Sequence, residues 1–362
     1  MNQKLEIKTK SKNYNIFLTE DIALEISEFL KNNNYSGVFL IVDKNVNDLQ
    51  NKRVSKIIRV CREYGFPNST IKNFEIIAKE DLKNIDVVRE IWKAMLEARL
   101  DRKTLVINIG GGITCDIGGF AACTFMRGID FINCPTTLLS MVDASVGGKV
   151  GVNFNGLKNI IGSFNQPSAV IIDAKFLDTL PEIEIISGMA EVIKHGLISS
   201  SEYVDFVEKN PKNYDEIIMR SCKIKADVVG QDESESGPRK ILNFGHTIGH
   251  AVEEIYIQKG KEITHGEAVA IGMVIEANIS MQIGKLSKDE FKRIKNILEK
   301  FNLPITSKLP IQVNEVLSLI IKDKKNVGRQ IKWTLLNGIG NAVFDQTVDE
   351  KIINESLKIL NS

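Results

Sequence analysis

The sequence LVINIGGGITCDIGG at residues 105–119 indicates how the first half of the chain folds. Its first five residues are nearly all apolar, which is typical of a strand covered on both faces. The glycines that follow predict a turn into a helix, since glycine lets the backbone approach a ligand closely. Amide N–H groups and the helix dipole at such a turn favour an anion, for example a pyrophosphate. The dinucleotide motif G-x-G-x-x-G is absent, so an ordinary tight turn explains the glycines about as well.

Apolar runs of the same kind recur through the first half of the chain, at Val38–Val42, Phe131–Cys134 and Ala169–Ile172. Segments with helical periodicity lie between the runs, at Ile22–Leu30 and Leu82–Leu96. This alternation predicts a mostly parallel sheet with helices on both faces. Residues 5–18 alternate less regularly and are consistent with an opening hairpin.

Strand patterns largely stop after Leu180-Pro181. Helical patterns then cover Ile183–Ser199, Asp215–Val229, Gly245–Ile257, His265–Ile283 and Lys288–Phe301. A β-like segment at Ile331–Leu336 precedes a final helix near Asp349–Leu360. We therefore predict an α/β nucleotide-binding domain over residues 1–178 and an all-α domain, which binds metal and substrate, over residues 179–362.

The composition of the 362-residue chain is that of an ordinary globular protein, with 43% hydrophobic residues, 26% charged residues and a formal net charge of +1. A nearly neutral charge argues against a general nucleic-acid footprint. No run reaches the roughly 18 apolar residues that a membrane span needs, and residues 1–10 lack the apolar core of a signal peptide. The five cysteines show no metal-type pairing and are expected to be reduced, which predicts a cytoplasmic protein.

Three of the four histidines cluster in FGHTIGH at residues 244–250 and HGE at residues 265–267. His246 and His250 are one helical turn apart and can share a helix face. His265 begins a second helical segment, so it could add a ligand from a neighbouring helix. Imidazole is a common ligand of divalent metals. The alternative is a set of structural histidines with satisfied hydrogen bonds.

A carboxylate that could complete a metal site lies in GMAEVIKH at residues 188–195. Glu191, Lys194 and His195 share one helix face by their spacing. Glu191 could add an oxygen ligand to two histidines and leave positions open for a substrate. The alternative is an ordinary helix salt bridge between Glu191 and Lys194.

Several cationic and amide side chains could gather near these motifs. Arg127, Lys149 and Lys158 lie on segments that resemble loops or hairpin edges, and Lys225, Arg239 and Asn243 approach the histidine helix along the sequence. Single surface lysines are usually only solvated, but a group of them beside glycine turns favours recognition of an anionic small molecule. Asp43 ends a predicted strand, where a carboxylate can bind a ribose, and Glu80 and Lys83 could add polar contacts. These features predict redox chemistry on a hydroxyl of a polyanionic substrate, in the cleft between the two domains.

The motifs resemble those of the 3-dehydroquinate synthase family, which belongs to the sugar phosphate cyclases. The matching segments are GGGITCDIGGFAACTFMRGIDFINCPTTLLSMVDASVGGKVGVN, LKNIIGSFNQP, GMAEVIKHG, LNFGHTIGHAVE, HGEAVAIGM and DKKN. These segments come in the family's order, and the resemblance extends from Asp43 to about Gly340. The resemblance implies a zinc ion bound by Glu191, His246 and His265, with His250 contacting substrate instead of metal.

The resemblance also implies which residues surround NAD and substrate. NAD would be bound by Asp43, Asn45, Glu80, Lys83, Gly111, Gly112, Asp116, Thr136, Thr137, Lys149, Lys158, Thr179 and Glu184. The substrate would be held by Arg127, Asp143, Lys149, Asn159, Lys194, Lys225, Arg239, Asn243, His250 and one lysine of the pair Lys324-Lys325. The candidate catalytic residues are Asp143, Lys149, Lys194 and His250, among which Asp143 and His250 are candidates for proton handling.

The implied activity converts 3-deoxy-D-arabino-heptulosonate 7-phosphate to 3-dehydroquinate and phosphate, in the shikimate pathway of aromatic amino acid biosynthesis. Such a carbon–oxygen lyase oxidises its substrate transiently with NAD, eliminates phosphate, returns the hydride and closes the ring by an intramolecular aldol step. Zn2+ is the expected metal, with Co2+ as a second candidate. The alternatives are another sugar phosphate cyclase, a metal-dependent polyol dehydrogenase, or a non-enzymatic descendant of the fold.

We also expect a homodimer, for which helix faces within Ile271–Ile283 could serve, and no nucleic-acid or membrane partner.

Overall fold

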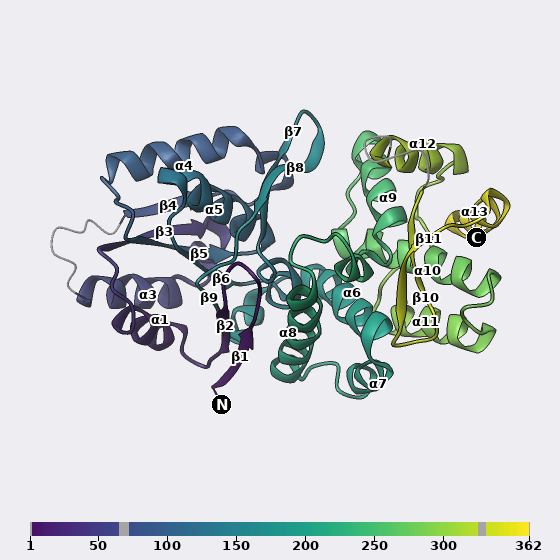
Figure 1. Cartoon of the computed structure of the whole chain (residues 1–362), viewed down its shortest axis with the longest axis horizontal. Helices are drawn as coiled ribbons and strands as arrows, with labels where there is room; N and C mark the ends of the chain where they lie inside the picture. The colour runs from purple at the N-terminus through teal and green to yellow at the C-terminus, as the bar shows by residue number, and fades with distance from the viewer. Residues whose placement is uncertain (1, 65–71, 325–330, 362) are drawn as a thin grey trace. The chain divides into compact units, whose positions relative to one another are not determined.

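The computed structural model describes residues 2–64, 72–324 and 331–361. The chain divides into two compact units (Figure 1). Unit 1 comprises Met1–Pro181 and Lys225–Glu233, and unit 2 comprises Glu182–Ile224 and Ser234–Ser362. The first division thus lies close to the predicted domain boundary. The sequence patterns did not predict that Lys225–Glu233 belongs to unit 1, because most of this segment is part of a continuous helix, α8 (Tyr214–Gln231), that begins in unit 2.

Unit 1 is built on a seven-stranded sheet with the strand order β1-β2-β9-β6-β5-β3-β4. The strands are β1 (Gln3–Ile7), β2 (Tyr14–Leu18), β3 (Gly37–Asp43), β4 (Lys72–Ile76), β5 (Thr104–Gly110), β6 (Phe131–Pro135) and β9 (Ala169–Ile172). Only the opening hairpin β1–β2 is antiparallel, and each other neighbouring pair is parallel. The predictions of a mostly parallel sheet and of an opening hairpin are therefore confirmed.

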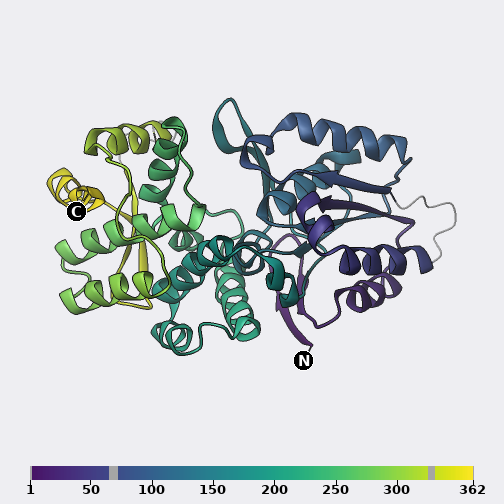
Figure 2. The same ribbon diagram turned by 180° about the vertical axis from the view of Figure 1, so that it is seen from behind.

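Helices cover both faces of this sheet, which explains why every residue of β3, β5, β6 and β9 is buried. Helices α4 (Ile85–Glu97) and α5 (Gly112–Thr124) lie on one face, and α1 (Ile22–Lys31) and α3 (Asn51–Glu63) lie on the other (Figures 1 and 2). A short helix, α2 (Lys44–Leu49), follows β3 directly. The core on the α4–α5 side is formed by apolar residues of both helices and the strands beneath them, among them Phe39, Ile91 and Phe131.

A separate antiparallel hairpin, β7 (Lys149–Phe154) with β8 (Leu157–Phe164), packs through β7 against α5. Asn155 and Gly156 form its turn with φ values of 49° and 77°, a geometry that asparagine and glycine adopt readily. Hairpin edges were predicted for this part of the chain. Val150, Gly151 and Val152 of β7 are buried, whereas every residue of β8 except Lys158 is exposed.

Unit 2 is mainly helical, with α6 (Glu182–Ser199), α7 (Ser201–Lys209), most of α8, α9 (His246–Gln258), α10 (His265–Gln282), α11 (Lys288–Lys300), α12 (Val313–Lys324) and α13 (Glu350–Leu357). A short 3-10 helix, Pro238–Asn243, precedes α9. The unit is not purely helical, because β10 (Trp333–Leu336) and β11 (Ala342–Gln346) form an antiparallel pair. None of the helices in the described part of the chain is long and apolar enough to cross a membrane.

Helix α10 is the central element of unit 2 and packs against α6, α9, α11, α13 and β10. Residues Ile271, Ile275 and Ile279 are at most 1% exposed, and buried residues surround the helix on every side. The expectation that Ile271–Ile283 offers a face for a homodimer is therefore wrong. The apolar and small residues of α10 pack against other elements of the same chain, as expected for a helix that is apolar on all sides.

Candidate active site

Three predicted metal ligands lie together in unit 2. Glu191 projects from the middle of α6, and His246 and His265 are the first residues of α9 and α10. One ligand atom from each of the three lies within 4.8 Å of the others. Two of the three ligands therefore stand at helix starts, and the third comes from a buried helix that packs against α10.

Both imidazoles turn the same nitrogen toward the Glu191 carboxylate. Nε2 of His246 lies 3.7 Å from Oε1 of Glu191, and Nε2 of His265 lies 3.6 Å from the same oxygen. The other oxygen, Oε2, pairs with Lys194, so the helix salt bridge and the facing histidines coexist. Two imidazole nitrogens and one carboxylate oxygen facing a common point are a ligand set that suits a zinc-type cation with open positions.

The second nitrogen of each ring is also held. Nδ1 of His246 lies 3.3 Å from the backbone oxygen of Phe244, and Nδ1 of His265 lies 3.7 Å from Oε2 of Glu253. A partner at Nδ1 fixes the ring orientation and leaves Nε2 to face the centre. Glu253 is a functional candidate that the sequence analysis missed. Its position seven residues after His246 on α9 is the only sequence signal that could have suggested it.

Electrostatics distinguish the two imidazoles. Burial lowers the pKa of His246 well below its usual value, and nearby Lys194 lowers it further. Burial also lowers the pKa of His265, but the carboxylates of Glu191 and Glu253 outweigh this effect and raise it to about 10. The two carboxylates around His265 stabilise positive charge there, whereas Lys194 disfavours positive charge at His246. A divalent cation would be stabilised by the same charges.

The N-termini of α9 and α10 are capped in different ways. In α10, Thr264 and Glu267 form a capping box, in which each side chain accepts a hydrogen bond from the other residue's backbone N–H. In α9 the cap residue is Gly245, which has no side chain to offer. The carboxylate of Glu276, from α10, accepts hydrogen bonds from the N–H groups of Gly245 and Ile248 instead. Glu276 was also missed by the sequence analysis.

His250 lies beside the metal group without belonging to it. Its ring centre is 5.3 Å from that of His246 and 6.2 Å from that of His265. The side chain is exposed, and it projects from α9 one turn after His246. This position leaves His250 accessible to a substrate.

The predicted phosphate cradle in unit 1 has the expected strand–turn–helix form. Gly111 caps α5 directly after β5. A Cβ atom on Gly111 would lie 3.1 Å from Cγ2 of Thr137, and the N–H of Thr136 donates to the oxygen of Gly110 at 3.0 Å. The glycine turn is therefore packed closely against the segment that carries the two threonines, and its backbone is held in place.

Four predicted cofactor and substrate residues belong to one polar network in unit 1. Nζ of Lys83 lies 2.5 Å from Oδ2 of Asp116 and donates to Oδ1 of Asn159, also at 2.5 Å. Asn153 joins them, because its amide donates to Glu80 at 2.8 Å and its oxygen accepts from the Asn159 N–H at 2.8 Å. Burial raises the pKa of Asp116, against the opposing charge of Lys83. Asn153 is a further residue that the sequence analysis did not select.

Other residues expected to bind NAD belong to several different elements. Asp43 ends β3 and caps α2 by accepting from the N–H of Asn45 at 3.0 Å, and burial raises its pKa. The hydroxyl of Thr179 accepts a hydrogen bond from Gln50 at 2.7 Å, which ties it to the start of α3. Burial raises the pKa of Glu184, which lies on α6 in unit 2. Lys158 lies 3.9 Å from Glu80.

The predicted substrate residues are divided between the units. Unit 1 contains Arg127, Asp143, Lys149, Asn159 and Lys225, and unit 2 contains Lys194, Arg239, Asn243 and His250. Lys225 is buried and donates to the backbone oxygen of Asp143 at 2.6 Å and to its carboxylate. Asn243 donates to Glu235 at 2.7 Å. Lys324 and Lys325 lie outside the residues whose side chains the structure describes.

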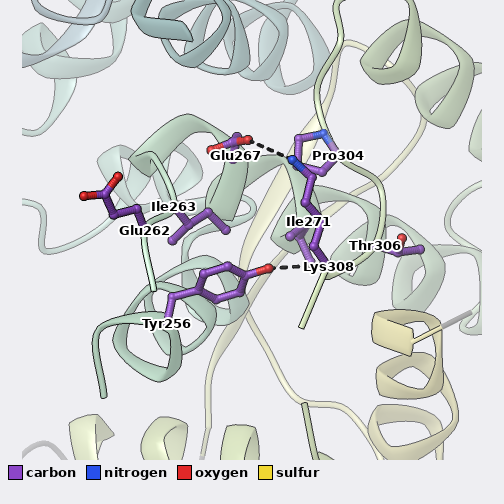
Figure 3. Close-up of a pocket in the computed structure, with 8 residues that line it drawn as sticks. All are labelled: Tyr256, Glu262, Ile263, Glu267, Ile271, Pro304, Thr306 and Lys308. Atoms are coloured by element: carbon purple, nitrogen blue, oxygen red, sulfur yellow. Dashed lines mark hydrogen bonds and ion pairs between the residues drawn. The ribbon is translucent and has the colours of Figure 1, made fainter. Parts of the chain in front are cut away.

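Unit 2 also contains a small pocket (Figure 3). It is lined by Tyr256, Glu262, Ile263, Glu267, Ile271, Pro304, Thr306 and Lys308. The ammonium of Lys308 lies 3.9 Å from Glu267, and the N–H of Lys308 donates to the hydroxyl of Tyr256 at 3.1 Å. The pocket shares Glu267 with the α10 capping box, and none of its lining residues is a predicted site residue.

Solved structures with the same fold define the class of protein. The chain is similar to 2-epi-5-epi-valiolone synthase from Streptomyces hygroscopicus, with NAD+ and Zn2+ bound, at 25% identity and a TM-score of 0.87 over 97% of both chains. A 2-deoxy-scyllo-inosose synthase aligns over 98% of both chains with a TM-score of 0.86 at 23% identity. A butanol dehydrogenase from Thermotoga maritima aligns less closely, with a TM-score of 0.68. The chain therefore has the fold of the sugar phosphate cyclases.

Sequence comparisons identify the family. The family models for the N-terminal and C-terminal parts of 3-dehydroquinate synthase match residues 73–187 and 188–326. The 3-dehydroquinate synthase of Pelagibacter ubique is 40% identical over 98% of both chains. That of Acetivibrio thermocellus is 39% identical over 96% of both. The chain belongs to the 3-dehydroquinate synthase family.

Proposed function

We propose that the protein converts 3-deoxy-D-arabino-heptulosonate 7-phosphate to 3-dehydroquinate and phosphate, and that Glu191, His246 and His265 hold the metal it needs. The observation that carries the proposal is the convergence of these three side chains, two of them at the starts of adjacent helices. Membership of the family supports the choice of substrate.

Bound NAD+ and Zn2+ would supply reversible hydride exchange and polarisation of a substrate hydroxyl. The presence of both groups in the related valiolone synthase supports them here. NAD would be bound by the Gly111–Gly112 turn, by Asp43 at the end of β3 and by the network around Lys83 and Asp116. Because the turn is a strand–glycine–helix junction, its N–H groups would face the pyrophosphate.

The remaining polar residues would bind the anionic ends of the substrate. We assign the carboxylate to Lys225, Arg239 and Asn243, and the phosphate to cations that include Lys149, Arg127 and Lys194. Arg239 and Lys225 are at most 5% exposed, and cations that are shielded from water hold a carboxylate more strongly than solvated ones. A cationic phosphate pocket also favours the departure of phosphate.

Proton handling is assigned to Asp143 and His250. Lys225 holds the Asp143 carboxylate in place, and His250 is an exposed imidazole beside the metal group. Near neutral pH an imidazole can accept a proton in its neutral form and donate one as imidazolium.

The deciding experiment supplies the heptulosonate phosphate to the purified protein with Zn2+ and NAD+. Phosphate release and a product with the mass of 3-dehydroquinate are expected, without net NADH. Absence of turnover would reject the proposed activity. Accumulation of NADH would indicate a polyol dehydrogenase instead.

Another sugar phosphate cyclase is the second candidate, because the solved cyclases in the comparison share the fold. Sedoheptulose and glucose phosphates lack a carboxylate, so they leave Lys225, Arg239 and Asn243 without a joint role. Parallel assays with those phosphates decide between the two candidates. Turnover of a carboxylate-free phosphate in preference to the heptulosonate would favour the second one.

We also propose that the protein forms a homodimer through the β7–β8 hairpin. The hairpin carries Phe154, Leu157, Ile160, Ile161 and Phe164, whose exposed fractions lie between 39% and 53%. A patch of this kind is a common protein–protein contact. Light scattering on Ile160→Glu, compared with Leu49→Glu on a different exposed surface, tests the assignment. A dimer that survives Ile160→Glu would exclude the hairpin.

We also propose that the protein is located in the cytoplasm. All five cysteines are free thiols, and four of them are buried, as is usual in a reducing compartment. Fractionation of cells that express the protein tests the location, and recovery from a membrane or extracellular fraction would contradict it.

A further inference from the structure

Helix α9 starts without a cap of its own, although it carries His246 at its first position. Its cap residue, Gly245, has a φ of 84°, a conformation that favours glycine. A Cβ atom there would lie 2.6 Å from Cγ of Met273 and 2.9 Å from the backbone oxygen of Val269. The close approach of α10 therefore leaves no room for the serine, threonine or aspartate that commonly caps a helix.

Glu276 of α10 supplies the missing cap from another helix. Its side chain is fully buried, and its oxygens accept from the N–H of Gly245 at 2.7 Å and from that of Ile248 at 3.2 Å. These are the cap and third-position N–H groups, the same two that Thr264 and Glu267 satisfy in α10. The Glu276 carboxylate thus accepts hydrogen bonds from the two N–H groups at the start of α9, whereas α10 uses two side chains, Thr264 and Glu267, for the equivalent N–H groups.

His246 lies between the two N–H groups that Glu276 accepts. We propose that Glu276 is a positioning residue for the metal centre, because it fixes the start of α9 and with it the His246 ring. The inference rests on the metal site proposed above. Glu276 acts on the metal centre through this helix start, because its two oxygens accept hydrogen bonds from the backbone N–H groups there.

The charge of Glu276 supports the same role. A helix start carries partial positive charge that disfavours a nearby cation, and α9 and α10 both begin at a metal ligand. The carboxylates of Glu276 and Glu267 accept hydrogen bonds at these two starts and offset that charge. A neutral side chain of equal size at position 276 would lose this compensation and would turn an N–H donor toward a backbone N–H.

The test measures Zn2+ affinity of the metal-free full-length chain by competition with a chelator. Glu276→Gln is expected to weaken Zn2+ binding about 10- to 100-fold, as loss of a residue that orients a ligand commonly does. Hydrogen exchange is expected to accelerate at residues 244–250. The matched control is Ile279→Val, a buried position on the same helix that contacts neither N–H group. It should lower the melting temperature without changing Zn2+ affinity.

If Glu276→Gln does not fold, Glu276→Asp replaces it in both measurements. This variant keeps the charge but shortens the side chain by one methylene, so the carboxylate no longer reaches the two N–H groups and Zn2+ binding should again weaken. Faster exchange at residues 244–250 together with wild-type Zn2+ affinity would overturn the inference. Equal loss of affinity in Ile279→Val would also overturn it, because general destabilisation would then explain the effect. Failure of the wild-type chain to bind Zn2+ would instead reject the proposed metal site.

Discussion

Oε2 of Glu253 lies 3.7 Å from Nδ1 of His265, while Nε2 of the same ring faces Glu191 at 3.6 Å. The imidazole is therefore held between two carboxylates, one on each nitrogen. In metal sites such an outer carboxylate fixes the tautomer and raises the basicity of the ligand. Glu253 connects the start of α10 to the body of α9, which also carries His246.

Glu253→Gln is expected to weaken Zn2+ binding about 10- to 100-fold, because the amide does not carry the charge that orients His265. Chelator competition on the metal-free chain measures the effect. Glu254→Gln is the matched control, since Glu254 is the next residue of α9 and accepts only a local hydrogen bond from Gln258 at 2.8 Å among the contacts described. Equal affinities in the two variants would show that Glu253 has no role at the metal.

His246→Ala is expected to abolish Zn2+ binding, whereas His250→Ala should retain it and lose turnover. The reason is geometric: only His246 turns a nitrogen to the Glu191 oxygen that His265 also faces. Bound zinc per chain, measured after gel filtration, separates the two variants. Similar zinc loss in both would mean that the ligand set has been assigned wrongly.

Lys225→Met is expected to lower kcat/KM about 10- to 100-fold with Zn2+ content unchanged. The buried ammonium makes charge-assisted contacts with Asp143, and such hydrogen bonds are worth about 1.5–3 kcal/mol. Lys223→Met, two residues earlier on α8 and exposed, should retain activity. Loss of zinc from Lys225→Met would contradict a role confined to substrate and Asp143.

Gly118→Ala should destabilise unit 1 by about 1–3 kcal/mol, the usual range for overpacking. A Cβ atom at position 118 would lie 1.9 Å from Oδ1 of the buried Asn108, so α5 would have to move away from β5. Urea denaturation measures the change. The control is Gly260→Asn, at an open position with a φ of 63°, which is expected to change stability little. If Gly118→Ala left the free energy of unfolding unchanged, α5 would be able to shift away from β5 without cost.

The contribution of Asp130 to stability should depend on pH. Burial raises its pKa, but hydrogen bonds from Lys12 and neighbouring hydroxyls outweigh this and keep the pKa below its usual value. A lowered folded-state pKa means that the stabilisation is present above the unfolded-state pKa and is lost as pH falls through the folded-state value. At pH 7, Asp130→Asn should cost about 1 kcal/mol or less, since the pair is partly exposed.

Urea denaturation of Asp130→Asn and of the unmodified chain at several pH values tests this prediction. The difference between the two free energies of unfolding should shrink toward zero at acid pH. A difference that stays constant with pH would assign the effect to packing and not to charge.

Much of unit 1 could be predicted from the sequence because its signals are local. A continuous apolar run such as Leu105–Ile109 followed by glycines permits few structures other than a buried strand and a turn. In unit 2, the helical segments and the clustered histidines could also be recognised in the sequence. The pattern of α10 was misleading, because small and apolar residues favour close helix packing in a core as much as at a dimer contact.

The strand–turn–helix junction and the side chains available to bind a metal could be predicted from the sequence, because both depend on residue type and short spacing. The roles of Glu253 and Glu276 follow instead from contacts between residues that are distant in sequence. Glu276 contacts Gly245 and Ile248 across 31 and 28 residues of sequence, and nothing in its own helix marks it as a cap. Contacts between separate helices depend on how the helices cross, and no local pattern encodes that crossing.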